Sequence, residues 1–258
     1  MNDPDRDLRT DIPHPARIYD YWLGGKDNFE IDRAGAHSAL EIIPEFLDYA
    51  AENRKFLVRS VRYLAEAGIR QFLDIGTGFP TSPNVHEMAG TDARVVYADN
   101  DPMVYSHAAG LLAKAPGASA ILADLRDPDA VFAAAGEHLD FDQPVGLMFV
   151  ACLHHIRDHD DPAGIVARYL EAMAPGSYLV LSHFTSDLNP ERSAASAANA
   201  EAWKMIFVPR TREEILRLFN GRPLVDPGLV LVSRWRPDAD DLGHNADRAW
   251  AYGGVAGR

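Results

Sequence analysis

Short, continuous apolar runs alternate with helix-like segments through the middle of the chain. Glycine, proline or aspartate bounds each run, and a segment with helical periodicity follows it. Strands that read as unbroken apolar runs are buried on both faces, as in parallel sheets covered by crossover helices. The pattern therefore predicts an α/β protein built on a Rossmann-like, doubly wound and mostly parallel sheet. The runs expected as parallel strands are 71–76, 94–99, 119–124, 144–152 and 177–184.

The chain begins differently, with helical periodicity before the first expected strand. Residues 33–67 place apolar side chains near one helical face, with a break at Pro44 and a glycine stop at Gly68. We therefore expect an N-terminal helical cap over residues 1–68, followed by the core that contains the sheet over residues 69–258.

The C-terminal part also departs from the alternation. Residues 211–219 predict a helix that opens with a capping box formed by Thr211 and Glu214. Residues 229–236 and 248–256 then read as strands with no helix between them. We expect these two segments to form an antiparallel pair at one edge, which completes a seven-stranded sheet.

Composition and charge narrow the possible partners and the compartment. The formal net charge of −13 repels nucleic acid phosphates and anionic lipid, so we expect neither partner. No apolar run approaches the ~20 residues of a membrane helix. The polar N-terminus carries no hydrophobic signal core. Together with a single cysteine, Cys152, these features favour a cytoplasmic protein.

A glycine turn follows the first expected strand. Asp74 ends that strand, and Gly76 and Gly78 form a Gly-x-Gly turn that leaves room for a ligand against the backbone. In open α/β sheets, ligands bind outside the carboxyl ends of the strands. A tight strand–helix turn without a ligand remains an alternative for this segment.

The next two expected strands also end in aspartate. Asp99 can accept both hydroxyl protons of a ribose, and Asp124 lies at a height suited to an adenine amino group. Asp101 and Asp127 each precede proline, and helix capping is the alternative role for them. Capping is less natural for the two strand-end aspartates.

The turn departs from the dinucleotide fingerprint. Thr81 stands where the third glycine of Gly-x-Gly-x-x-Gly belongs, and Pro80 precedes it. An acid such as Asp74 before the glycines suits a positively charged amino group better than a pyrophosphate. A nicotinamide-dependent oxidoreductase shares the fold and stays open as an alternative.

These motifs resemble those of class I S-adenosylmethionine-dependent methyltransferases. The segments 73–78, 97–101 and 123–125 are similar to the first three motifs of that superfamily, and residues 149–156 to the segment after its fourth strand. Over nearly the whole chain, the sequence also resembles an actinomycete family of S-adenosyl methyltransferases, formerly a domain of unknown function. The resemblance implies methyl transfer from S-adenosylmethionine, with S-adenosylhomocysteine as product, to an unidentified small-molecule acceptor. A non-catalytic protein that binds these cofactors is the alternative.

The resemblance also implies cofactor roles for the matching positions. The turn from Gly76 to Gly78 is expected under the methionine and ribose, with Asp74 near the amino-acid end. Asp99 is expected at the ribose hydroxyls and Asp124 at the adenine amino group. The full implied set is Asp74, Gly76, Thr77, Gly78, Asp99, Asn100, Asp124, Leu125, Ala151 and Leu153.

Histidines follow the fourth and fifth expected strands. His154, His155 and His183 are candidates for a general base, because imidazole titrates near neutral pH. The alternative is that they line the pocket or bond to backbone. Residues 154–161 also contain metal-ligand types, but their spacing matches no defined site, so we expect no metal.

The segment 17–33 combines aromatics with polar groups ahead of the expected helices. Its aromatics, Tyr21 among them, are expected to wall off solvent, and Lys26 and Asn28 to meet the polar end of the cofactor. The alternative is a plain amphipathic helix stopped by Gly24. Near the other end of the chain, Trp203, Met205 and Phe207 read either as substrate-pocket lining or as core.

Overall fold

The structure is a computed structural model that describes residues 10–239 and 247–257. Its centre is a single seven-stranded sheet in the order β3-β2-β1-β4-β5-β7-β6. Strands β1 to β5 pair in parallel, and β7 pairs antiparallel with both β5 and β6. The predicted fold class is confirmed. The strands are β1 Gln71–Ile75, β2 Arg94–Asp99, β3 Ala118–Leu122, β4 Gly146–Val150, β5 Tyr178–Phe184, β6 Val230–Leu231 and β7 Ala251–Gly257.

The antiparallel edge differs in detail from the prediction. Residues 229–236 were expected as one strand, but only Val230–Leu231 pair with β7, and the 3-10 helix Val232–Arg234 follows. Burial explains the change, because Val232 and Trp235 turn inward against the helix Phe46–Glu66 and fill the core there. Residues 240–246, between the two segments, lie outside the described residues.

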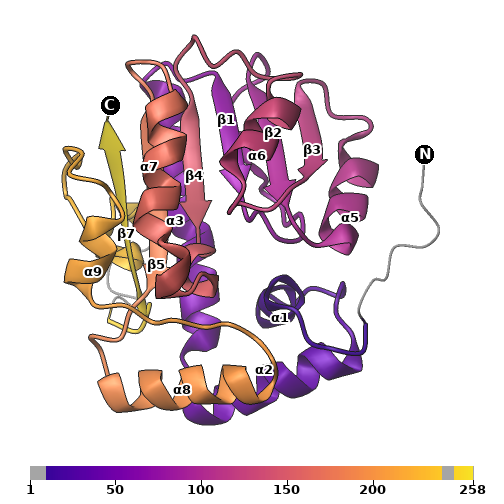
Figure 1. Ribbon diagram of the computed structural model, residues 1–258, viewed down its shortest axis with the longest axis vertical. Coiled ribbons are helices and arrows are strands. Elements are labelled where there is room, and N and C mark those ends of the chain that lie inside the picture. Colours follow the sequence, from indigo (N-terminus) through magenta and orange to yellow (C-terminus); the bar gives the residue numbers. More distant parts are fainter. Residues whose placement is uncertain (1–9, 240–246, 258) are drawn as a thin grey trace.

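Helices precede the sheet and connect its strands (Figure 1). The predicted helical segments are present, and the first two long helices are separated at Pro44 as expected. Among the described residues, no helix is long and apolar enough to cross a membrane. The α-helices are α1 Pro15–Trp22, α2 Glu30–Ile42, α3 Phe46–Glu66, α4 Val85–Met88, α5 Pro102–Leu112, α6 Pro128–Ala135, α7 Pro162–Ala172, α8 Pro190–Ala202 and α9 Arg212–Arg217.

Side-chain caps begin several of the crossover helices. Asp101, Asp127 and Asp161 each stand directly before a proline and accept a hydrogen bond from a backbone N–H in the first turn. Proline suits the first helical position because its missing N–H would be unpaired there anyway. Asp101 and Asp127 are therefore helix caps, as the alternative interpretation had it. Thr211 and Glu214 form the predicted capping box of α9.

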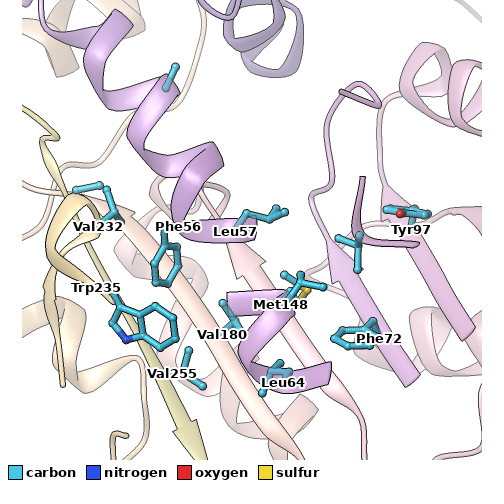
Figure 2. Close-up of a cluster of buried hydrophobic side chains, with 14 of the residues drawn as sticks. Phe56, Leu57, Leu64, Phe72, Tyr97, Met148, Val180, Val232, Trp235 and Val255 are labelled. Atoms are coloured by element: carbon cyan, nitrogen blue, oxygen red, sulfur yellow. The ribbon is translucent and has the colours of Figure 1, made fainter. Parts of the chain in front are cut away.

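Successive strand residues feed two separate cores, one on each face of the sheet. Phe72 of β1 belongs to the core beneath α3, and its neighbour Leu73 belongs to the core beneath α6 and α7. Figure 2 shows the α3 side, where Phe56 and Leu64 of that helix lie over the sheet. Two covered faces explain why these strands read as unbroken apolar runs.

The N-terminal helices divide between the sheet and the space beyond its strand ends. Helix α3 packs along one face of the sheet, whereas α1 lies beyond the carboxyl ends of the parallel strands (Figure 1). Helices α2 and α8 run side by side beneath α1. A domain boundary at residue 68 stays a prediction, and α3 belongs both to the predicted cap and to a core of the sheet.

Candidate active site

The turn after β1 depends on two glycines. Gly76 and Gly78 have φ angles of 67° and 66°, in the left-handed region that favours glycine. A Cβ added at Gly76 would lie 2.5 Å from Cβ of Cys152, which is closer than real Cβ contacts. At Gly78 the nearest atom is Cβ of Ala16, 4.0 Å away. The first glycine is thus required for packing and conformation, and the second keeps the backbone open beneath α1.

Two buried carboxyls support this turn. Asp74 accepts a hydrogen bond from Thr77 Oγ1 at 3.0 Å, and burial raises the pKa of Asp74 to about 6. Asp99 accepts hydrogen bonds from the backbone N–H groups of Gly78 and Asp101, both at 2.9 Å. Burial also raises the pKa of Asp99. Since an ionised carboxylate has about four lone-pair sites, Asp99 keeps acceptor capacity for a further partner.

The end of β3 carries a carboxylate held by an arginine. Asp124 accepts hydrogen bonds from the backbone N–H and the guanidinium of Arg126. Burial raises the pKa of Asp124, but the bonds from Arg126 outweigh burial and leave the net pKa below its ordinary value. This side chain is therefore an anion and an acceptor at neutral pH.

These strand ends open into one cavity that continues beneath the helices. It has a volume of about 360 Å³ and reaches from the turn after β1 to side chains of α1, α2, α3 and α8. That volume falls within the range of about 300–1,000 Å³ for small-molecule sites. The predicted cofactor residues that line it are Asp74, Gly76, Thr77, Gly78, Asp99, Asn100, Asp124, Leu125 and Ala151.

Four other predicted cofactor residues do not line the cavity. Lys26 is exposed, and the Tyr21 hydroxyl pairs with Nε2 of His37 at 2.7 Å. Asn28 donates its amide to Asp20 and to a backbone carbonyl, so it braces the chain after α1. Leu153 is fully buried in the core on the α7 side of the sheet.

The segment 17–33 thus combines both of its interpretations. Helix α1 ends before Gly24, which has a φ of 79°, as the plain-helix alternative expected. Tyr19 and Trp22 nevertheless line the cavity. In the segment after α8, Met205 and Phe207 also line the cavity, whereas Trp203 does not.

The three histidines have different environments. His183 donates from Nδ1 to the Phe184 carbonyl and accepts at Nε2 from Arg210, since a guanidinium can only donate. Burial lowers the pKa of His183 to about 3. Both ring nitrogens are bonded and His183 does not line the cavity, so its role is structural and not that of a base.

His154 and His155 both line the cavity. Nδ1 of His155 lies 2.8 Å from the Ile206 carbonyl, so it carries the proton and Nε2 carries the lone pair. Burial lowers the pKa of His155 to about 4. Nδ1 of His154 receives only a long contact of 3.5 Å from the Phe184 N–H, and burial lowers the pKa of His154 well below its ordinary value. Both rings are neutral at physiological pH.

A chain of buried hydrogen bonds joins α1 to the end of β4. The N–H of Ala151 donates to Ser182 Oγ at 3.0 Å, and that hydroxyl donates to Asn53 Oδ1 at 2.6 Å. The Asn53 amide donates to the Tyr19 hydroxyl at 3.0 Å. Ala151 itself has a φ of 58°, an uncommon conformation for a residue with a Cβ. These hydrogen bonds thus hold Ala151, a strained residue of the cavity wall, in place relative to α1.

Sequence reasoning missed several lining residues on α3. Tyr49, Asn53 and Arg54 all line the cavity. Helical spacing places Asn53 on the same face as the buried Tyr49 and Phe56, so a polar residue within an apolar face was the available signal. Arg54 carried no comparable signal, because a mid-helix arginine is ordinarily a solvated surface residue.

Comparison with known proteins shows which family the chain resembles over its whole length. The model of a family described as S-adenosyl methyltransferase matches residues 1–258. A DUF574 family protein from Streptomyces avermitilis is 41% identical, with a TM-score of 0.93 over 98% of this chain and 100% of its own. A Thermobifida fusca protein, provisionally named a methyltransferase, is also 41% identical, with a TM-score of 0.89 over 100% of this chain and 99% of its own.

More distant structures share the fold. An S-adenosylmethionine-dependent methyltransferase from Mesorhizobium loti is 17% identical, with a TM-score of 0.54 over 78% of this chain and 96% of its own. A comparison with curated proteins gives no match. The expected resemblance, the enzyme class and the S-adenosylmethionine cofactor are confirmed, and nothing favours the non-catalytic alternative. The chain belongs to the S-adenosyl methyltransferase family.

Proposed function

We propose that the cavity binds S-adenosylmethionine at the strand ends, and a small-molecule acceptor between this cofactor and the helices α1, α2 and α8. The observation that carries this proposal is the continuity of the cavity from the turn after β1 to the helices. A methyl donor and its acceptor must share one enclosed space, since alignment and exclusion of water supply most of the rate of such a displacement.

The strand-end residues fit this cofactor. The backbone from Gly76 to Gly78 is open to a ligand, and the remaining acceptor capacity of Asp99 suits the two hydroxyls of a ribose. The anionic Asp124 suits an adenine amino group. When bound, the cofactor supplies a methyl group activated by a positively charged sulfur, and the buried Asp74 places negative charge at this end of the cavity.

We assign the cofactor's carboxylate to Arg54. Arg54 lines the cavity, and its charge is close enough to Asp74 to favour the charged form of that carboxyl. The same side chain donates to the carbonyls of Thr81 and Pro83, so it is anchored to the loop after β1. An anchored guanidinium loses less conformational entropy when it binds a carboxylate. Lys26, which lies outside the cavity lining, has no role in this proposal.

We also propose that the acceptor is not a nucleic acid and that the protein acts in the cytoplasm. The net charge of −13 supports an acceptor other than nucleic acid. A single buried and free Cys152 supports a location in the reducing cytoplasm.

Calorimetric titration of the purified protein tests the cofactor assignment. We expect S-adenosylhomocysteine to bind and nicotinamide adenine dinucleotide not to bind. Arg54→Gln removes one charge-assisted contact to the carboxylate, so we expect about a tenfold loss of affinity for S-adenosylhomocysteine. Lys26→Ala is the matched control, because it also removes one cation near the N-terminal helices but outside the cavity.

Equal losses in the two variants would show a general charge effect and overturn the role of Arg54. Failure of the unmodified protein to bind S-adenosylhomocysteine, with its circular dichroism spectrum that of a folded α/β protein, would overturn the cofactor site itself.

A further inference from the structure

The acceptor end of the cavity has an aromatic wall. Trp22 stacks on Phe46 with ring centroids 4.5 Å apart and an interplanar angle of 11°. Tyr49 and Phe207 meet Phe46 edge-on at 6.2 and 5.9 Å. All of them line the cavity, and they come from α1, α3 and the segment after α8. Flat apolar rings around an enclosed space favour a planar, apolar ligand.

Polar hydrogens on this wall have no partner within the described residues. The Tyr49 hydroxyl and the Trp22 indole N–H are both buried and unbonded there. Tyr49 is only 2% exposed. Because buried polar groups are nearly always hydrogen-bonded, these two groups indicate partners that arrive with a ligand.

An oriented amide adds a further donor. The Ser38 hydroxyl donates to Asn199 Oδ1 at 2.7 Å, which directs the Asn199 NH₂ elsewhere, and Asn199 lines the cavity. The hydroxyl of Tyr49, the N–H of Trp22 and the amide of Asn199 are all donors, so they favour a ligand with oxygen acceptors, such as a carbonyl.

His155 supplies the opposite kind of group. Its Nδ1–H is used by the Ile206 carbonyl, so Nε2 can only accept. The ring of His154 is 4.4 Å from the ring of His155 and 6.3 Å from that of Tyr49, so the acceptor nitrogen and the hydroxyl donor belong to the same part of the cavity. A lone-pair nitrogen accepts a hydrogen bond from a donor on the ligand, such as a hydroxyl.

The charges in the cavity argue against a protonated amine. Among the described lining residues, the carboxylates are Asp74, Asp99 and Asp124, all at the strand ends. A protonated amine beneath the helices would therefore be buried beside neutral histidines and rings, without a counter-ion.

We propose that the acceptor is a planar hydroxyaromatic compound that carries a carbonyl oxygen, and that it is methylated on its hydroxyl with Nε2 of His155 as the base. This inference rests on the proposed function. The hydroxyl oxygen forms a bond to the methyl carbon while the carbon–sulfur bond breaks, and the electron pair stays on sulfur. The hydroxyl proton passes to Nε2 of His155 and returns to solvent after the products leave.

The low basicity of His155 is compatible with this step. An oxygen that gains a methyl group while it still holds its proton becomes a much stronger acid than imidazolium. Even an imidazole with a pKa of about 4 therefore takes the proton. An alkylammonium product would keep its proton against so weak a base, so such a base serves an oxygen acceptor rather than an aliphatic amine.

Equilibrium binding with defined probes tests the acceptor class. The protein is saturated with S-adenosylhomocysteine and titrated with 4-hydroxyacetophenone, acetophenone, 4-aminoacetophenone and cyclohexanol. We expect 4-hydroxyacetophenone to bind about fivefold more tightly than acetophenone, since one hydrogen bond contributes about that factor, and 4-aminoacetophenone, a weaker donor, to bind between the two. Cyclohexanol lacks both the ring and the carbonyl, and we expect it to bind most weakly.

Matched variants separate the two polar contacts. Tyr49→Phe removes only the unbonded hydroxyl, and Tyr21→Phe is its control, because the Tyr21 hydroxyl lies outside the cavity lining. We expect Tyr49→Phe to weaken binding of 4-hydroxyacetophenone and of acetophenone, and to raise or preserve the melting temperature of the free protein. His155→Asn keeps a donor for the Ile206 carbonyl but lacks Nε2, so it should abolish the preference for the hydroxyl.

The outcomes distinguish this inference from the proposed function. If S-adenosylhomocysteine binds but 4-hydroxyacetophenone binds no better than acetophenone or cyclohexanol, the acceptor class is overturned and the cofactor site stands. A hydroxyl preference that survives His155→Asn would remove His155 as the base. If S-adenosylhomocysteine itself does not bind, the proposed function fails first.

Discussion

The two ends of the cavity are built in opposite ways. The cofactor end consists of backbone and short polar side chains that follow neighbouring parallel strands, and each motif occupies a few consecutive residues. The acceptor end consists of large side chains from α1, α2, α3, α8 and the segment after α8, which are far apart in sequence. In our proposal, the first end binds a cofactor common to a superfamily, and the second selects the acceptor of this protein.

The largest expected effect comes from filling the glycine turn. Gly76→Ala forces a Cβ into Cys152 at a left-handed position, and we expect it to destabilise the protein by about 4 kcal/mol and to abolish S-adenosylhomocysteine binding. Gly24→Ala is the control, because Gly24 also has a positive φ but its added Cβ would meet nothing within 4 Å. Denaturant unfolding of both variants measures the difference, and equal losses would reduce the effect to backbone strain.

Burial of the Asp74 carboxyl makes the stability of the protein depend on pH. Its folded-state pKa of about 6 lies above the ordinary value of 3.8. Between those values the folded protein holds a proton that the unfolded chain has lost, so stability falls as pH rises through this window. Asp74→Asn mimics the protonated form, and we expect it to stabilise the free protein by up to about 3 kcal/mol at pH 7.5.

The same substitution should weaken cofactor binding, because the charge that destabilises the free protein faces a cationic ligand. Melting temperatures at pH 4 and pH 7.5, together with S-adenosylmethionine titrations, check both statements. Unchanged stability of Asp74→Asn at pH 7.5 would show that burial of the Asp74 carboxylate does not destabilise the protein.

The smallest of these effects is expected at Asn53, which connects the two ends of the cavity. Asn53→Ala removes the bond to the Tyr19 hydroxyl and the acceptor for Ser182, and we expect a loss of about 2 kcal/mol in unfolding free energy. Because Asn53 connects both ends, binding of S-adenosylhomocysteine and of 4-hydroxyacetophenone should both weaken. Weakening of only one would show that the two ends are independent.

The contrast between the ends also explains what the sequence could reveal. Asp74, Gly76 and Asp99 could be predicted to meet at one cavity because strand, turn and acid are consecutive, and parallel strands bring their carboxyl ends together. Tyr49 and Arg54 were not found as site residues, because one turn of α3 faces both the core and the cavity. Helical periodicity identifies a buried face but not which part of it meets a ligand.

Polar partners were equally hard to foresee. Lys26 and Asn28 have the right chemistry for a cofactor carboxylate, but Asn28 is used to hold the turn after α1 and Lys26 lies outside the cavity lining. His183 has the right residue type for a base, but Arg210 occupies its lone pair. In each case the deciding contact is made by a tertiary neighbour.

The hydrogen-bond chain from Tyr19 through Asn53 to Ser182 has a consequence for engineering. These residues lie on α1, α3 and β5, and the last of them holds the wall formed by Ala151. Exchange of α1 and α2 between relatives, as a route to new acceptors, would break this chain unless its members moved together. The transferable unit for altered specificity is therefore the helices together with Asn53 and Ser182, and a graft that includes them should keep the cofactor end intact.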